Sequence, residues 1–157
     1  MKNKLIENLY KEELTGKSGF YCCVRVKNLD EINSFLKSRF DLEFDTKYYP
    51  HATIVSSDVV PTGVAFSDDE IVGTGYKFGI LGNSLVIILD SIDLIERHNL
   101  WIAEGCVSSY PEYIPHVTVI DNVSSTYGLS DKISNLLSKQ FSLDFKFGKE
   151  IVDDNII

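Results

Sequence analysis

Residues 110–119 read Tyr-Pro-Glu-Tyr-Ile-Pro-His-Val-Thr-Val, and residues 50–54 repeat the core of this stretch as Pro-His-Ala-Thr-Ile. The side chains of an extended strand alternate between its two faces, so residues two apart point the same way. His51 therefore lies beside Thr53 on one strand, and His116 lies beside Thr118 on another. The repeat predicts two related half-sites that face each other.

Two imidazoles on opposite sides of a phosphodiester supply the proton transfers that in-line cleavage needs. A neutral ring accepts a proton from the nucleophile, and a protonated ring gives one to the leaving oxygen. Both states are accessible near neutral pH because the unperturbed pKa of histidine is about 6.5. His51 and His116 are thus the candidate acid/base pair. Thr53 and Thr118 are candidate donors to the non-bridging phosphate oxygens.

A structural interpretation stands beside the catalytic one. Histidine on a strand often fills a core or edge position, and threonine is a good strand former. The repetition, with a proline before each histidine, favours the catalytic interpretation. His98 has no threonine at the second position after it, so we expect it to be structural.

The order of predicted elements also repeats along the chain. A strand at 19–27, a helix at 30–39 and a strand at 51–56 come first. Strands at 70–81 and 84–89 follow, then a helix capped by Ser91 or Asp93 that runs to Glu104, and a strand at 116–120. We expect an α+β fold of two pseudo-repeated lobes, with antiparallel sheets flanking a central cleft and helices on the outside.

The remaining segments complete one predicted domain over residues 1–157. Apolar spacing predicts an N-terminal helix at 3–14 and a further helix at 129–139, in which Ile133, Leu136 and Leu137 point inward. Alternating phenylalanine and leucine residues predict a strand at 141–147. The pattern of residues 148–157 decides neither a helix nor a strand.

Composition limits the classes of function. The chain has 157 residues and a formal net charge of −8, which opposes tight binding of long nucleic acid. No apolar run is long enough to span a bilayer, so we expect no membrane partner and a cytoplasmic location. Three cysteines without C-x-x-C spacing, and histidines without H-x-H or H-E-x-x-H spacing, favour no metal site and no cofactor.

The paired motifs resemble the 2H phosphoesterases, a superfamily with two His-x-Thr motifs on the strands of two similar lobes. Within that superfamily, the lead-in at 110–116 resembles the phage T4-type anti-CBASS nucleases, as do residues 85–91, 97–100 and Gly105. These viral enzymes degrade the cyclic di- and trinucleotide messengers of bacterial antiviral signalling. The resemblance covers residues 19–152.

This resemblance implies a metal-independent phosphodiesterase that opens 3′-5′ linkages of cyclic oligonucleotides, such as 3′,3′-cGAMP, in the host cytoplasm. It assigns His51 and His116 as the acid/base pair, with Thr53 and Thr118 as phosphate ligands. An N-terminal tyrosine and a glutamate near the C-terminus contact the nucleotide in the viral family. Tyr10 and Glu150 match them here, although the spacing from His116 to Glu150 is longer than the family pattern.

Two alternatives stay open. One is a 2′-5′ phosphodiesterase or RNA-end-processing enzyme of the same superfamily. The other is a nucleotide-binding sponge that sequesters its ligand without hydrolysis, although a sponge has no need of two matched His/Thr pairs. The sequence decides neither which histidine is the base nor the oligomeric state.

Overall fold

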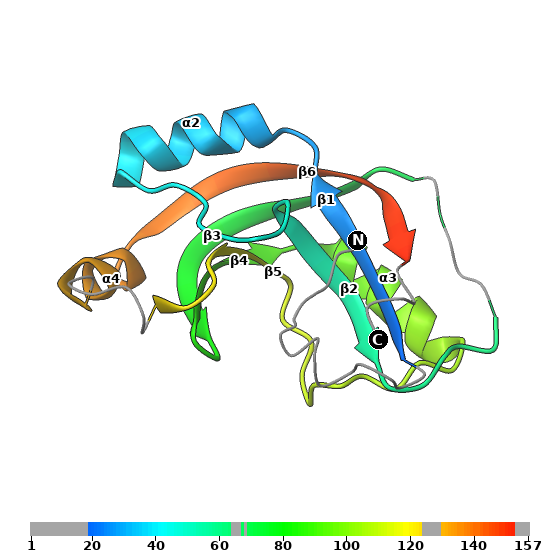
Figure 1. Cartoon of the computed structure of the whole chain (residues 1–157). Coiled ribbons are helices and arrows are strands. Elements are labelled where there is room, and N and C mark those ends of the chain that lie inside the picture. The colour runs from blue at the N-terminus through cyan, green and yellow to red at the C-terminus, as the bar shows by residue number, and fades with distance from the viewer. Residues whose placement is uncertain (1–18, 64–66, 68, 124–129, 153–157) are drawn as a thin grey trace.

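The computed structural model describes residues 19–63, 67, 69–123 and 130–152, which form a mixed α+β fold (Figure 1). Six strands form one antiparallel sheet with the order β2-β1-β6-β3-β4-β5. The elements are β1 (Phe20–Val26), α2 (Leu29–Phe40), β2 (His51–Ser57), β3 (Ile71–Leu81), β4 (Ser84–Asp90), α3 (Ile92–Ala103), β5 (His116–Ile120), α4 (Ser130–Leu137) and β6 (Gln140–Val152). The helix predicted at 3–14 lies outside the described residues.

The strand–helix–strand order predicted for each half is confirmed, as β1, α2, β2 and as β4, α3, β5. The expected pair of separate sheets is wrong, because the strands of both halves join in one sheet. The reason lies in β6, which continues through residues 148–152, where the sequence pattern was undecided. Its C-terminal part pairs with β1 and its N-terminal part pairs with β3.

The hydrophobic core lies on one face of this sheet. Alternate residues of β6 enter it, as the sequence predicted, and Phe145 and Phe147 are almost fully buried. Helix α2 lies along β6 in Figure 1 and contributes Ile32 and Leu36 to the core. Helix α3 contributes Trp101, whose ring centroid is 4.9 Å from that of Phe20. Both helices therefore cover the face opposite to the one that carries the histidines.

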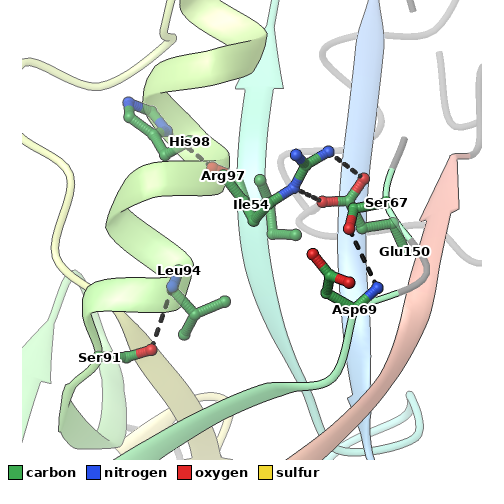
Figure 2. Close-up of polar contacts among 8 residues, drawn as sticks. All are labelled: Ile54, Ser67, Asp69, Ser91, Leu94, Arg97, His98 and Glu150. Atoms are coloured by element: carbon green, nitrogen blue, oxygen red, sulfur yellow. Dashed lines mark hydrogen bonds and ion pairs between the residues drawn. The ribbon is translucent and has the colours of Figure 1, made fainter. Parts of the chain in front are cut away.

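Helix α3 is fixed to the sheet through its first turn. The Leu94 N–H donates to the Ser91 hydroxyl oxygen at 3.1 Å (Figure 2). That hydroxyl donates to the Val72 carbonyl of β3 at 2.7 Å. Asp93 accepts a hydrogen bond from the Val72 N–H at 3.0 Å. Of the two caps that the sequence allowed, the structure has Ser91, and Asp93 anchors the same turn to the strand.

The two ends of the sheet, β2 and β5, contact each other. The chain that enters β2 runs beside β5, where the Asp45 N–H donates to the Val119 carbonyl at 2.7 Å. Asp45 also forms a parallel bridge with Ile120. The sheet is thus curved far enough to bring its two edge strands together, and each edge strand carries one His-x-Thr motif.

We expect the Gly75→Ala substitution to destabilise the fold. A Cβ at Gly75 would lie 2.6 Å from Cγ2 of Ile87 and 3.0 Å from Cε1 of Phe145, both in the core. Overpacking of this kind lowers the free energy of unfolding by roughly 1–3 kcal/mol. Urea unfolding measures the change. Gly148→Ala is the control, because its nearest neighbour would be 4.0 Å away. Equal unfolding midpoints for the two variants would contradict the packing of β3 described here.

Candidate functional site

The two histidines are held in the same way. His51 Nδ1 lies 2.7 Å from the Tyr49 carbonyl oxygen, and His116 Nδ1 lies 2.7 Å from the Ile114 carbonyl oxygen. A carbonyl only accepts, so each Nδ1 carries the hydrogen and each neutral ring keeps Nε2 as its proton acceptor. Both imidazoles therefore offer Nε2 for proton transfer.

The repeated proline explains how this contact forms. In both motifs the residue between the accepting carbonyl and the histidine is proline, Pro50 or Pro115. Proline locks its own φ near −65° and restricts the residue before it to extended conformations. The restricted backbone thus favours a conformation in which the imidazole Nδ1 reaches the carbonyl oxygen two residues earlier.

The predicted alternation along both strands is confirmed. His51 and Thr53 are half-buried, whereas Ala52 between them is fully buried in the core. His116 and Thr118 alternate in the same way with buried Val117. Both motifs therefore project from the sheet face opposite to the core, at edges that contact each other.

Burial is the main cause of the electrostatic state of both imidazoles. It lowers the pKa of His51 to about 4, against the raising effect of the hydrogen bond to Tyr49. The charges of His116 and Arg25 lower the pKa of His51 further. Burial also lowers the pKa of His116, against the hydrogen bond to Ile114. The two histidines are near enough to influence each other, and both are neutral at pH 7.

Thr53 is fixed by two tyrosines that sequence reasoning missed. The Tyr21 hydroxyl lies 2.8 Å from Oγ1 of Thr53. The Tyr113 hydroxyl donates to the Thr53 carbonyl at 2.7 Å. Burial raises the pKa of Tyr113, so this hydroxyl keeps its proton. The signal for Tyr113 was its place in the lead-in to His116, but only the folded chain shows that it reaches the other motif.

His98 of α3 contacts the backbone of β2, the strand that carries His51 and Thr53. The β1–β2 register shifts because β2 has a bulge at Ile54, between the partners of Cys22 and Cys23. His98 Nδ1 lies 2.7 Å from the Ile54 carbonyl oxygen, and its ring stacks on Tyr113 with centroids 4.1 Å apart. Thr53 is next to this bulge, and bulges commonly re-orient the side chains beside them. The structure thus agrees with the structural role expected for His98.

Glu150 is placed apart from the histidines. It pairs with Val24 of β1, whereas Thr53 pairs with the adjacent Cys23, so the two side chains leave opposite faces of the sheet. Its carboxylate forms an ion pair with Arg97 of α3, with Nε–Oε2 and Nη2–Oε1 distances of 2.5 and 3.0 Å (Figure 2). The side chain of Glu150 is 1% exposed. Its contact with nucleotide stays a prediction, and Tyr10 lies outside the described residues.

A pocket of about 490 Å³ lies away from the paired motifs, along β3, β6 and the start of α3. Its charged lining is mainly acidic, with Asp90, Asp93, Asp144 and Lys146. Asp93 already accepts the Val72 N–H. This lining does not suit an anionic ligand, so the pocket is not the phosphate site.

Within the described ranges, no group of three His, Cys, Asp or Glu side chains is placed to hold a metal ion. In the same part of the chain, no helix is long and apolar enough to cross a membrane.

Comparison with known proteins adds one finding. A family model described as "Anti-CBASS protein Acb1" matches residues 18–155, which include both His-x-Thr motifs. No curated protein matches the chain.

The Arg97–Glu150 ion pair gives a stability prediction. Arg97→Met leaves the buried carboxylate of Glu150 unpaired, which we expect to lower the free energy of unfolding by about 3–5 kcal/mol. The double variant Arg97→Met/Glu150→Leu removes both charges and should recover most of that loss. Chemical unfolding of the single and double variants measures the difference. A single variant as stable as the native protein would contradict the burial of this pair.

The lowered pKa of His51 predicts how stability depends on pH. The unfolded chain takes up this proton near pH 6.5, whereas the folded chain resists it until about pH 4. Stability is therefore full above pH 6.5 and falls as the pH drops toward 4, at up to about 1.4 kcal/mol per pH unit for this one group. His51→Gln should flatten the dependence in that window. Thermal unfolding from pH 7.5 to 4.5 measures it, and identical curves for both proteins would rule out the lowered pKa.

Proposed function

The chain belongs to the family of the anti-CBASS protein Acb1, and we propose that it counters CBASS as a phosphodiesterase that opens cyclic di- and trinucleotide messengers at 3′-5′ linkages. One observation carries the proposal. Both histidines hold Nδ1 on a backbone carbonyl at 2.7 Å and leave Nε2 for proton transfer, each beside a threonine on the same strand face. Such a matched pair suits a reaction that needs one base and one acid.

The fold supports a further proposal, that the chain is a 2H phosphoesterase. Each half has a strand, a helix and a strand, and the last strand of each half begins with its histidine. The two histidine strands are the outer strands of the sheet and contact each other. A pair of half-sites related in this way is what the superfamily resemblance implies.

In the first step, the ribose 2′-hydroxyl beside the scissile phosphate attacks phosphorus. His51 Nε2 accepts the hydroxyl proton as the new P–O2′ bond forms, and His116 donates a proton to O5′ as the P–O5′ bond breaks. We assign His51 as the base because its pKa is lowered to about 4, mainly by burial and further by the charges of His116 and Arg25, so that its ring is neutral and free to accept a proton. The product of this step is a 2′,3′-cyclic phosphate at one end of the opened ring.

In the second step, water opens the cyclic phosphate with the roles reversed. Neutral His116 takes a proton from water, and protonated His51 returns one to the leaving ribose oxygen. No metal is needed for these proton transfers, because the two imidazoles supply both. Binding of the substrate raises the pKa of His116, because the phosphate anion favours the protonated imidazole. His116 can therefore carry the proton that the first step requires.

The threonines complete the site. Thr53 and Thr118 donate hydrogen bonds to the non-bridging oxygens, whose charge grows in the transition state. Tyr21 directs Thr53, because its hydroxyl lies 2.8 Å from Oγ1 and can donate to it. The Thr53 hydrogen is then left for the phosphate.

The test uses 3′,3′-cGAMP in buffer with EDTA and chromatography of the products. We expect linear dinucleotide from the native chain, and losses in kcat of roughly 10²–10⁴ for both His51→Ala and His116→Ala. A cyclic dinucleotide with 2′-deoxyribose at the scissile position should stay intact while it still binds. Unchanged turnover of that analogue would exclude attack by the 2′-hydroxyl.

Two other outcomes identify the alternatives. Intact ligand recovered after denaturing a complex, with no linear product at any enzyme concentration, would indicate a sponge. Faster cleavage of 2′-5′ oligoadenylate than of cyclic dinucleotide would indicate a 2′-5′ phosphodiesterase.

A further inference from the structure

Arg25 lies directly beside His51. The two residues are partners in the β1–β2 register, so their side chains leave the same face of the sheet. The Cβ atoms of such cross-strand partners are about 4.5–5.5 Å apart. The charge of Arg25 is also near enough to lower the pKa of His51. A cation thus stands next to one catalytic imidazole, on the face from which that imidazole projects.

This arginine is exposed and has no carboxylate partner among the described residues. Arg97, by contrast, is held by Glu150. A guanidinium that is free of carboxylates can form two parallel hydrogen bonds to a phosphate.

The neighbour of Arg25 is an aromatic ring. The guanidinium carbon lies 5.6 Å from the centroid of Tyr49, a tyrosine that is 46% exposed. The backbone carbonyl of Tyr49 also accepts the hydrogen bond from His51 Nδ1, so Tyr49 is part of the His51 half-site. Exposed aromatic rings stack on nucleobases, and an adjacent arginine adds a cation–π contribution.

We propose that Arg25 and Tyr49 form a second subsite beside His51, in which Arg25 binds the non-scissile phosphodiester of a cyclic nucleotide and Tyr49 stacks on one base. The inference rests on the proposed function, because the two histidines and two threonines account for only one phosphodiester. A cyclic dinucleotide always carries a second one, held near the first by the closed ring. The subsite thus selects ligands with at least two phosphodiesters.

The experiment measures binding by calorimetry with two ligands that cannot be cleaved through a 2′-hydroxyl. One is a cyclic dinucleotide of 2′-deoxyribose, with two phosphodiesters. The other is the linear dinucleoside monophosphate with the same bases and one phosphodiester. We expect the native chain to bind the cyclic ligand at least about tenfold more tightly, the size of one hydrogen bond to a charged group.

Arg25→Ala should reduce this preference to near unity, and Arg25→Lys should restore part of it, because lysine keeps the charge without the planar fork. Tyr49→Leu should weaken binding of both ligands by roughly tenfold, the effect of one stacked base. Arg39→Ala is the matched control. Arg39 is also a guanidinium over an aromatic ring, 5.1 Å from the centroid of Phe35, but it lies on α2, which packs on the opposite face.

An unchanged preference in Arg25→Ala would overturn the inference, as would an equal loss in Arg39→Ala. A native chain that binds neither ligand, or both equally, would also overturn it. Failure of the proposed hydrolysis is a separate result. In that case the native chain would prefer the cyclic deoxy ligand and Arg25→Ala would not, but the native chain would leave ribose 3′,3′-cGAMP intact.

Discussion

The whole arrangement depends on β6, because this one strand pairs with both halves of the chain. Its C-terminal part pairs with β1 and its N-terminal part with β3. A single curved sheet results, whose outer strands are the two that carry the histidines. The segment before β2 then hydrogen-bonds to β5 and holds these outer strands together. His51 and His116 are 65 residues apart in the sequence. The pairings of β6 with β1 and β3 are what place their two strands in the same sheet.

The chemistry of the site follows from backbone rather than from side-chain partners. Each histidine is oriented by a carbonyl two residues earlier, through a proline that limits the backbone. A neutral carbonyl orients the ring without the strong pull of a carboxylate, which would raise the pKa of the imidazole. Burial can therefore lower the pKa of both rings and keep them neutral at pH 7.

Much of this was predictable from sequence, because the patterns concerned are local. The spacing of apolar residues predicts the strands that carry His51 and His116 and the helix that begins after Ser91. It also predicts the alternation of buried and exposed residues in β6. The single sheet was not predictable, because Glu150 and its neighbours lack a clear period and acquire their strand from pairing with β1. The contacts of Tyr21 and Tyr113 with Thr53 could not be predicted either. They depend on the register between β1 and β2 and on the bulge at Ile54, and no sequence pattern indicates either of these.

Both histidine strands have a bulge after their threonine, at Ile54 and at Val119, and the half-sites differ in the contacts made by the lead-in to the second motif. The lead-in to His116 includes Tyr113, which crosses to hold the Thr53 carbonyl, while His98 holds the next carbonyl at Ile54. These two rings stack on each other, so the backbone of the first motif rests on residues of the second half. The position of Thr53 is therefore coupled to that of His116, three residues beyond Tyr113. Through Tyr113, the lead-in at 110–115 is thus part of how the two motifs are aligned.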